Sequence, residues 1–163
     1  MKPEESKSNP ANQRKVKCFG SKAALTVEAC PLITNGEMSG ETLNLDVAPR
    51  ERENVIWEKK ITVQLSENEL PIFACVCLGY LPKGEFKRPS KGITVERQSN
   101  KLYISATQGA GNIHGLPIPI GQTFHVGNIA LMQLQKQTGN NDSELLIAAL
   151  RGAAALYRIT DKA

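Results

Sequence analysis

The chain has 163 residues, of which 40% are hydrophobic, and it carries a formal net charge of +4. This length and composition suit one domain with a buried core and exclude two large independent domains. The pI near 8.9 favours polyanionic partners, although many ordinary soluble proteins share that charge balance. No apolar run is long enough to cross a bilayer.

The first 14 residues mix Lys, Glu, Ser, Asn and Pro with almost no apolar side chain, so they are predicted to form a disordered tail. They lack the apolar run of a secretory signal, and their two glutamates argue against a mitochondrial transit peptide. We therefore expect the protein to stay in the cytoplasm, and to associate with the nucleoid if the source is bacterial.

Alternation of apolar and polar residues predicts about four strands in the first half of the chain. They cover residues 15–19, 23–29, 43–47 and 55–65, with a loop at residues 34–40. The hydrophobic period then changes to that of a helix over residues 66–79. Ser66 and Glu69 have the spacing of a capping box at its start, and Gly79 is placed to end it.

A similar plan follows in the second half. Strands are predicted at residues 93–97 and 101–107, followed by an edge strand with two prolines at 113–120 and a helix at 123–138. A final amphipathic helix over residues 143–157 is expected to bury one apolar face. The residues assigned to that face are Leu146, Ala149, Leu150, Ala153 and Tyr157.

These elements predict an α+β fold in one domain over residues 15–163. It contains two antiparallel sheet-plus-helix units, at about residues 15–79 and 92–139, and the C-terminal helix follows them. A flexible basic loop over residues 83–92 is expected to join the two units. Within this loop, cations surround Phe86, which is interpreted as exposed, and Lys87, Arg88 and Lys91 are candidates to hold phosphates. A plain soluble linker is equally compatible with this composition.

The four cysteines are Cys18, Cys30, Cys75 and Cys77. They form no CxxC motif, and both histidines are distant in sequence, so we expect no metal site and no cofactor. Cys75 and Cys77 lie in an apolar helical run, where reduced cysteine behaves as a small hydrophobe. This usage fits a reducing compartment.

Nonspecific binding of a single strand needs cations for the phosphates and flat exposed side chains for the unstacked bases. Phe19 shares a strand face with Lys17, and Tyr103 shares one with Lys101. In both strands the opposite face already carries the apolar residues, so these rings are candidates to hold bases. The alternative is an aromatic residue at a sheet edge with no ligand.

Further candidates lie in two segments of the first half. Lys22 is on the polar face of its strand beside the small Ala24, which allows nucleic acid or another subunit to approach closely. Lys60 is on the polar face of a later strand, and Lys59 interrupts the apolar series there, which indicates a bulge or the rim of the sheet. Trp57 belongs to that apolar series, so a core position is favoured and stacking is a secondary hypothesis.

Two sequence segments resemble the plant Whirly family. Residues 20–28 read Gly-Ser-Lys-Ala-Ala-Leu-Thr-Val-Glu, and the later segments read Trp-Glu-Lys-Lys from Trp57 and Leu-Ser-Glu-Asn-Glu from Leu65. In that family a Lys-Gly-Lys-Ala-Ala-Leu-Ser segment opens a strand, and a Trp-x-x-Lys strand ends at a Leu-Ser-x-x-Glu helix start. Lys22 matches the second lysine of the family motif, whereas Gly20 and Ser21 replace the lysine and glycine before it.

The resemblance implies two blade-like antiparallel sheets, held by helices that associate four subunits. Single-stranded DNA would lie between the blades against lysines and aromatics. Similar architecture occurs in trypanosome mitochondrial RNA-binding proteins and, as half units that dimerise, in the positive cofactor four coactivators. RNA is therefore an alternative ligand.

The combined prediction is a sequence-nonspecific single-stranded DNA-binding protein with a role in DNA replication, repair, transfer or transcription. It is expected to be a homo-oligomer, dimer or tetramer, with no membrane partner. We expect no catalysis, because the sequence has no P-loop, no HExxH and no paired carboxylate motif. The alternatives are a single-stranded RNA-binding protein and an oligomeric adaptor that binds no nucleic acid.

Overall fold

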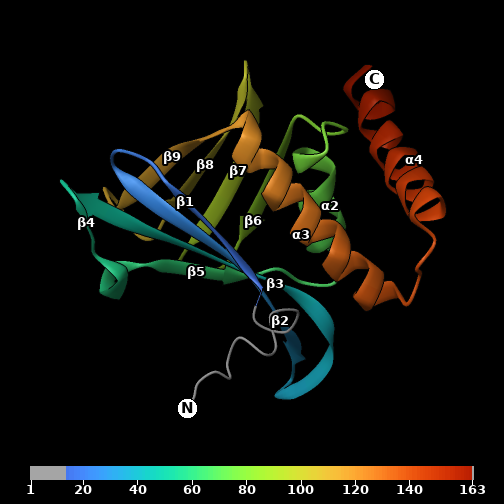
Figure 1. The fold of residues 1–163 in the computed structure, drawn as a ribbon, viewed down its shortest axis with the longest axis horizontal. Coiled ribbons are helices and arrows are strands. Elements are labelled where there is room, and N and C mark those ends of the chain that lie inside the picture. The colour runs from blue at the N-terminus through green and yellow to red at the C-terminus, as the bar shows by residue number, and fades with distance from the viewer. Residues whose placement is uncertain (1–13, 163) are drawn as a thin grey trace, which may run out of the picture.

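The computed structural model describes residues 14–162, and the expected disordered tail lies outside them except for Arg14. Two antiparallel sheets and three α-helices make up this part of the chain, as the predicted α+β class requires (Figure 1). The first sheet contains β1 (Lys15–Phe19), β2 (Ala23–Thr34), β3 (Glu37–Glu51), β4 (Asn54–Val55) and β5 (Ile61–Gln64). The second contains β6 (Lys83–Lys87), β7 (Gly92–Gln98), β8 (Lys101–Thr107) and β9 (Ile113–Pro119). The remaining elements are the 3₁₀ turn η1 (Trp57–Lys59) and the helices α2 (Glu69–Cys77), α3 (Ile120–Thr138) and α4 (Ser143–Lys162).

The two sheets have different topologies. In the first, β2 lies between β1 and β3, and the other edge of β3 pairs with β5 along one stretch and with β4 along another. The second sheet is a simple meander in the order β6-β7-β8-β9. Its edge strand β9 carries Pro117 and Pro119, which is where strand prolines are tolerated because they lack an N–H donor.

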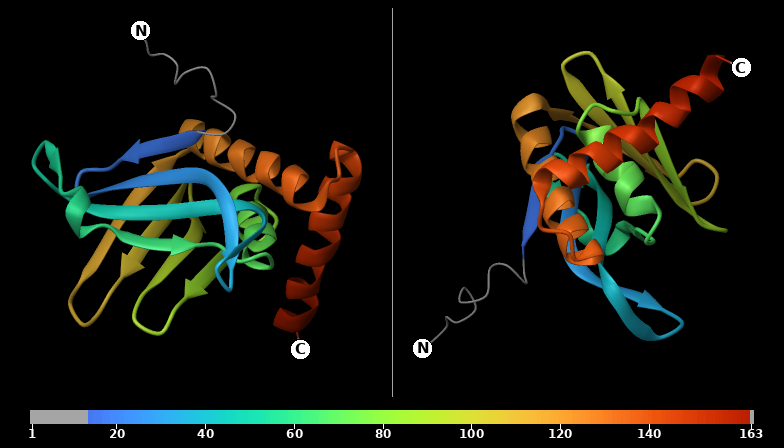
Figure 2. Two further views of the ribbon diagram at one scale, coloured as in Figure 1. Left: turned by 90° about the horizontal axis from the view of Figure 1, so that it is seen from below. Right: turned by 90° about the vertical axis from the view of Figure 1, so that its right-hand side faces the viewer.

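The helices gather at one end of the sheets. α2 and α3 pack against each other, α2 also contacts β6 and β7, and α3 contacts β3 (Figure 1). α4 lies outside them and reaches the rest of the molecule through α2 (Figure 2). At the β1–β2 turn, a Cβ added to Gly20 would lie 2.7 Å from the Cβ of Leu116, so the lack of a side chain allows this turn to touch β9. No helix in residues 14–162 is long and apolar enough to cross a membrane.

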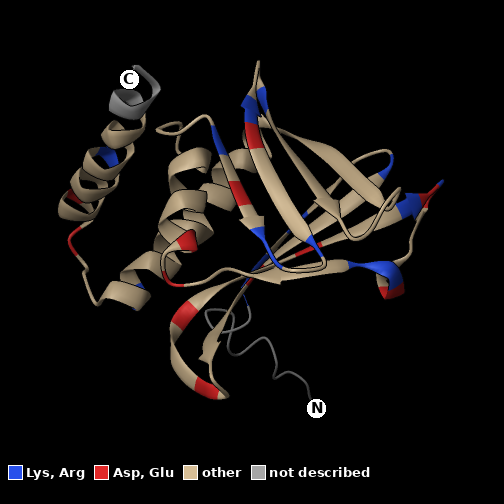
Figure 3. Ribbon diagram, turned by 180° about the vertical axis from the view of Figure 1, so that it is seen from behind, with Lys and Arg blue, Asp and Glu red and all other residues tan. Residues whose placement is uncertain are grey.

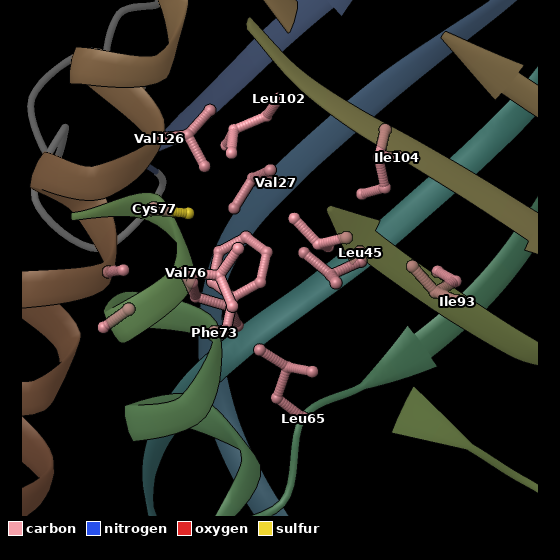
Figure 4. Packing of buried hydrophobic residues seen from close by; sticks show 14 of the residues in the cluster. Val27, Leu45, Leu65, Phe73, Val76, Cys77, Ile93, Leu102, Ile104 and Val126 are labelled. Carbon is pink, nitrogen blue, oxygen red and sulfur yellow. The ribbon is translucent and has the colours of Figure 1, made fainter. Parts of the chain in front are cut away.

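One hydrophobic core joins both sheets to the helices. Val27 of β2, Leu45 of β3 and Ile104 of β8 point toward the same space as Phe73 of α2 and Val126 of α3 (Figure 4). All five side chains are buried, because the inward positions of the strands are consistently apolar.

The predicted start and end of α2 are confirmed by hydrogen bonds. The Ser66 N–H donates to Glu69 Oε1 (2.9 Å), and the Glu69 N–H donates to Ser66 Oγ (3.2 Å), which is the reciprocal pair of a capping box. At the other end Gly79 has a φ of +89°, and the N–H of Tyr80 donates to the carbonyl of Cys75 at 2.8 Å. That bond and left-handed glycine form a Schellman motif.

The predicted basic loop at residues 83–92 is wrong, because its first half, Lys83–Lys87, is strand β6. Its inward side chain Phe86 is fully buried and packs edge-on against Phe73, with ring centroids 6.1 Å apart. Gly84 is the other inward residue, and a Cβ there would lie 3.3 Å from Ile72 of α2. The second sheet therefore has the fourth strand that the sequence pattern did not reveal.

The predicted strand over residues 55–65 is also interrupted. Trp57 lies in η1 and is only half-buried, so the core position favoured for it is wrong.

The predicted loop at residues 34–40, conversely, is mostly strand. The turn itself is Asn35-Gly36, both with positive φ, and β2 and β3 continue to it as a long ribbon that extends from the body (Figure 2).

The C-terminal helix buries a different stripe from the one predicted. Leu146 and Leu150 are buried as expected, and the third buried position is Ala154. Ala149, Ala153 and Tyr157 are exposed. The three buried positions are four residues apart, which places them on one side of the helix.

Candidate nucleic-acid interface

The outer face of the five-stranded sheet carries an exposed aromatic ring. Phe19 of β1 points away from the core and is 55% exposed, as the sequence predicts. Its neighbours across the sheet are Ala24 of β2 and then Ala48 of β3. Both alanines are fully buried although they belong to the outer face. Ala24 is therefore part of a covered surface rather than the open approach point that the sequence suggested.

Trp57 lies on this same outer face. The Lys17 Nζ is 5.5 Å from the centre of the indole, the geometry of a cation–π contact. Lys17 and Phe19 alternate along β1 and share its outer side, so the contact places all three side chains on one surface. We call Lys17, Phe19 and Trp57 the aromatic cluster.

A set of cations lies at the end of this sheet farthest from the helices. Lys22, Lys59 and Lys60 were predicted from the sequence, and the structure adds Arg50 near the end of β3 and Arg52 in the turn that follows it. We call these five residues the basic end. Acidic residues of the same turns are interspersed with them (Figure 3). The two arginines were missed because the charged run after Pro49 was interpreted only as the end of a strand.

The turns at the basic end are tied together by Arg50. Its Nη1 donates to the Gly20 carbonyl at 2.8 Å, and its Nε donates to the Arg52 carbonyl at 2.8 Å. Its backbone N–H donates to the Lys22 carbonyl at 2.9 Å. Arg50 thus fixes the position of Lys22, and its guanidinium donates to backbone carbonyls of the protein.

Several lysines of the outer faces already face carboxylates. Lys60 Nζ is 3.8 Å from Asp46 Oδ2, and the Thr62 hydroxyl donates to the other oxygen of Asp46 at 2.6 Å. Lys15 pairs with Glu28 at 3.9 Å. Among the described side chains, Lys22, Lys59 and Arg52 form no ion pair, which makes them the cations of the basic end best able to accept a phosphate.

The candidates at the β6–β7 turn have different roles from those predicted. Lys87 is exposed but pairs with Glu85 at 3.4 Å, and Lys83 pairs with the same carboxylate at 3.1 Å. These two ammonium groups lower the pKa of Glu85. Lys91 lines a groove of about 740 Å³ that also contains Gln64 and Asn68. The turn is therefore not a free cationic clamp.

Arg88 is an internal structural residue. Its guanidinium donates to both oxygens of Glu69, at 2.8 and 3.0 Å, and to the Gln64 carbonyl at 2.6 Å. Burial alone would raise the pKa of Glu69, but the hydrogen bonds from Arg88 and Ser66 outweigh it and lower the pKa below its ordinary value. The bidentate pair in turn raises the pKa of Arg88. This geometry does not favour the phosphate-binding role predicted for Arg88, because its donors are engaged within the protein.

Lys101 and Tyr103 lie on the outer face of the other sheet. Lys101 is exposed and Tyr103 is half-buried, while Leu102, Ile104 and Ala106 of the same strand are buried. The predicted alternation of β8 is therefore confirmed. The structure places these two residues on a sheet separate from the aromatic cluster.

The cysteines are free thiols in the described part of the chain. Cys18, Cys75 and Cys77 are buried, and desolvation raises the pKa of Cys18 and Cys75 to about 11. A thiol with so high a pKa carries little thiolate at neutral pH. Cys75 and Cys77 are in the core, as the helical pattern predicted.

No protein-family model matches this chain, and no curated protein sequence does. Solved structures do show the same fold. The MRP1/MRP2 proteins of Trypanosoma brucei superpose with a TM-score of 0.57 over 80% of this chain and 90% of theirs, at 12% identity. A guide-RNA-binding protein complex bound to a guide RNA gives a TM-score of 0.50 over 70% of this chain and 92% of the matched chain, at 14% identity. These likenesses establish the fold, which is the architecture that the Whirly resemblance implied.

The Glu69 carboxylate should control stability in acid. Because its pKa is lowered in the folded state, its contribution is present above the unfolded-state pKa of about 4.3 and is lost as pH falls through the folded-state value. We expect Glu69→Gln to reduce the free energy of unfolding at pH 7 by about 1–3 kcal/mol. The loss should shrink between about pH 5 and pH 3, where the wild type also loses the charge.

Urea denaturation at several pH values measures both effects. Glu67→Gln is the matched control, because Glu67 is an exposed carboxylate in the same turn. A Glu69→Gln variant whose stability falls with pH in parallel with the wild type would contradict the assignment.

Proposed function

We propose that this protein binds single-stranded nucleic acid with little sequence specificity, on the outer face of its five-stranded sheet. The observation that carries the proposal is the aromatic cluster. Phe19 is 55% exposed, so its ring contributes little to the packing of the core. The ring lies beside Lys17 on the face that carries Trp57. Exposed rings beside cations are what unstacked bases and their phosphates require.

The surroundings of the cluster are consistent with this role. Ala24 and Ala48 lie across the sheet from Phe19 and are fully buried, so the exposed ring itself is the surface that a base can reach. Lys22 and Lys59 at the basic end are exposed and unpaired among the described residues, and they supply charge for a backbone that leaves the cluster. Contacts of this kind hold bases and phosphates without reading base edges, so little sequence preference is expected.

DNA and RNA are both candidate ligands. The sequence resemblance to the Whirly family favours single-stranded DNA. The likeness to a guide-RNA-binding complex supports RNA as the second candidate. Fluorescence anisotropy with labelled single-stranded DNA, single-stranded RNA and duplex DNA across a salt series separates them. Absence of binding to all three at low salt would contradict the proposal and favour a protein adaptor.

Removing the exposed ring should weaken binding without affecting the fold. Phe19→Ala deletes the stacking surface, and we expect a loss of about 1–3 kcal/mol in binding free energy, or about 5- to 150-fold in Kd. Phe124→Ala is the matched control, because Phe124 is similarly exposed, at 66%, but lies on α3. Equal affinities for the two variants would reject the site.

Charge reversal at the basic end should change the salt dependence. Lys22→Glu with Lys59→Glu removes two cations that form no internal ion pair, so the fold should be retained. Each phosphate contact with a single strand contributes about 0.7 to the slope of log K against log salt, so the double variant should reduce the slope by about 1–2. Lys136→Glu on α3 is the control, and an unchanged slope in the double variant would exclude these lysines.

We also propose that the protein is a homo-oligomer associated through α4. This helix buries Leu146, Leu150 and Ala154 and exposes Leu145, Ala149 and Ala153. A second copy of the chain is the occupant that the Whirly resemblance implies for such a helix.

A charge on the exposed side of α4 should dissociate the oligomer. Ala149→Glu adds a carboxylate there without touching Leu146 or Leu150, whose burial makes deletion of the helix a poor test. Light scattering should give a mass above 17.8 kDa for the wild type and a smaller mass for the variant. A wild-type mass of one chain, or an unchanged mass in the variant, would reject the proposal.

A further inference from the structure

Tyr103 occupies an unusual place on the second sheet. It lies on the outer face of β8, where its register partner on β9 is Pro117, while Ser105 pairs with Gly115. Gly115 is therefore the diagonal neighbour of Tyr103 on the same face. It is flanked on β9 by Leu116, which points into the core.

The ring of Tyr103 fills the space that a side chain at Gly115 would need. A Cβ built on Gly115 would lie 2.4 Å from the tyrosine hydroxyl oxygen, 2.9 Å from Cζ and 3.0 Å from Cε2. The backbone of Gly115 has no positive φ, so an L-residue is sterically possible there as far as the backbone is concerned. Glycine at this position is therefore explained by the ring above it.

This contact determines how the ring is presented. A tyrosine that stood upright on the sheet would leave the neighbouring diagonal position free. Here the end of the ring reaches over Gly115, so the ring leans across β9 with one side against the sheet, and the residue is half-buried. Among the described side chains, its hydroxyl forms no hydrogen bond, so it is available to a ligand.

We propose that Gly115 is a positioning residue that lets Tyr103 lie down as a second platform for an unpaired base, on the four-stranded sheet. The inference rests on the proposed single-strand binding and deepens it: nucleotides would contact both sheets, with one at the aromatic cluster and another at Tyr103. Lys101, exposed on the same face two residues before Tyr103, is placed to meet the adjoining phosphate. The ring offers its free face to any base, because every base has a π-face.

A double-substitution cycle tests this role. Gly115→Ala adds one methyl group that forces the ring off the sheet. Tyr103→Ala removes the ring that serves as the platform. The double variant keeps the methyl group but has no ring for it to clash with. Gly121→Ala is the matched control, because its added methyl group on α3 meets no atom within 4 Å. Single-strand binding by anisotropy and thermal unfolding are measured for all five proteins.

We expect Gly115→Ala and Tyr103→Ala to weaken binding of a single strand by a similar factor, of the order of ten-fold. The double variant should bind no more weakly than Tyr103→Ala alone. Gly115→Ala should lower the melting temperature, and replacing Tyr103 as well should restore it. This recovery, measured without any ligand, would show that the added methyl group clashes with the Tyr103 ring.

Two results would overturn the inference. One is a Gly115→Ala variant that binds a single strand as tightly as the wild type. The other is a double variant whose loss of affinity is the sum of the two single losses. Either result would show that Gly115 does not act through Tyr103. In both cases binding by the wild type would leave the proposed function standing. A wild type that binds no single strand would instead overturn the proposed function, and this platform with it.

Discussion

The bidentate pair between Arg88 and Glu69 holds together three segments that the rest of the structure depends on. Glu69 accepts from the guanidinium while it caps the backbone of Ser66, and Arg88 also donates to the carbonyl of Gln64. The start of α2, the end of β5 and the turn after β6 are thereby fixed to one another. Because both side chains are partly buried, the pair is less exposed to salt than the lysine pairs on the outer faces. The two sheets acquire their relative position at this point and through the shared core.

Local sequence signals predicted most of the elements correctly. The capping box of Ser66 and Glu69 and the glycine stop at Gly79 each depend on residues a few positions apart. Strand β6 was missed for a physical reason. Its inward positions are Gly84 and Phe86, and a glycine carries no hydrophobic signal, so a single buried ring among charged residues resembles a loop. The prediction of which α4 residues are buried was partly wrong because that side of the helix is determined by its packing against α2. The hydrophobic periodicity of α4 alone does not identify this partner.

The candidate site was predictable in part. The outward direction of Phe19 and Tyr103 follows from alternation alone. The contact of Lys17 with Trp57 does not, because it joins residues 40 positions apart across a turn whose shape the sequence pattern obscured. Ion pairs such as Lys60 with Asp46 depend on the register between strands, so the number of lysines in the sequence overstates the charge free for a ligand. Arg88 is the clearest case, since its charge is fully engaged within the protein.

The two prolines of β9 have a consequence for how the molecule meets others of its kind. A sheet edge normally presents a row of N–H and C=O groups that a passing strand can extend. Pro117 and Pro119 lack the N–H, so the row is incomplete just before the chain turns into α3. The end of β9 is thus a poor template for an added strand from another molecule, which disfavours edge-to-edge growth of the four-stranded sheet there.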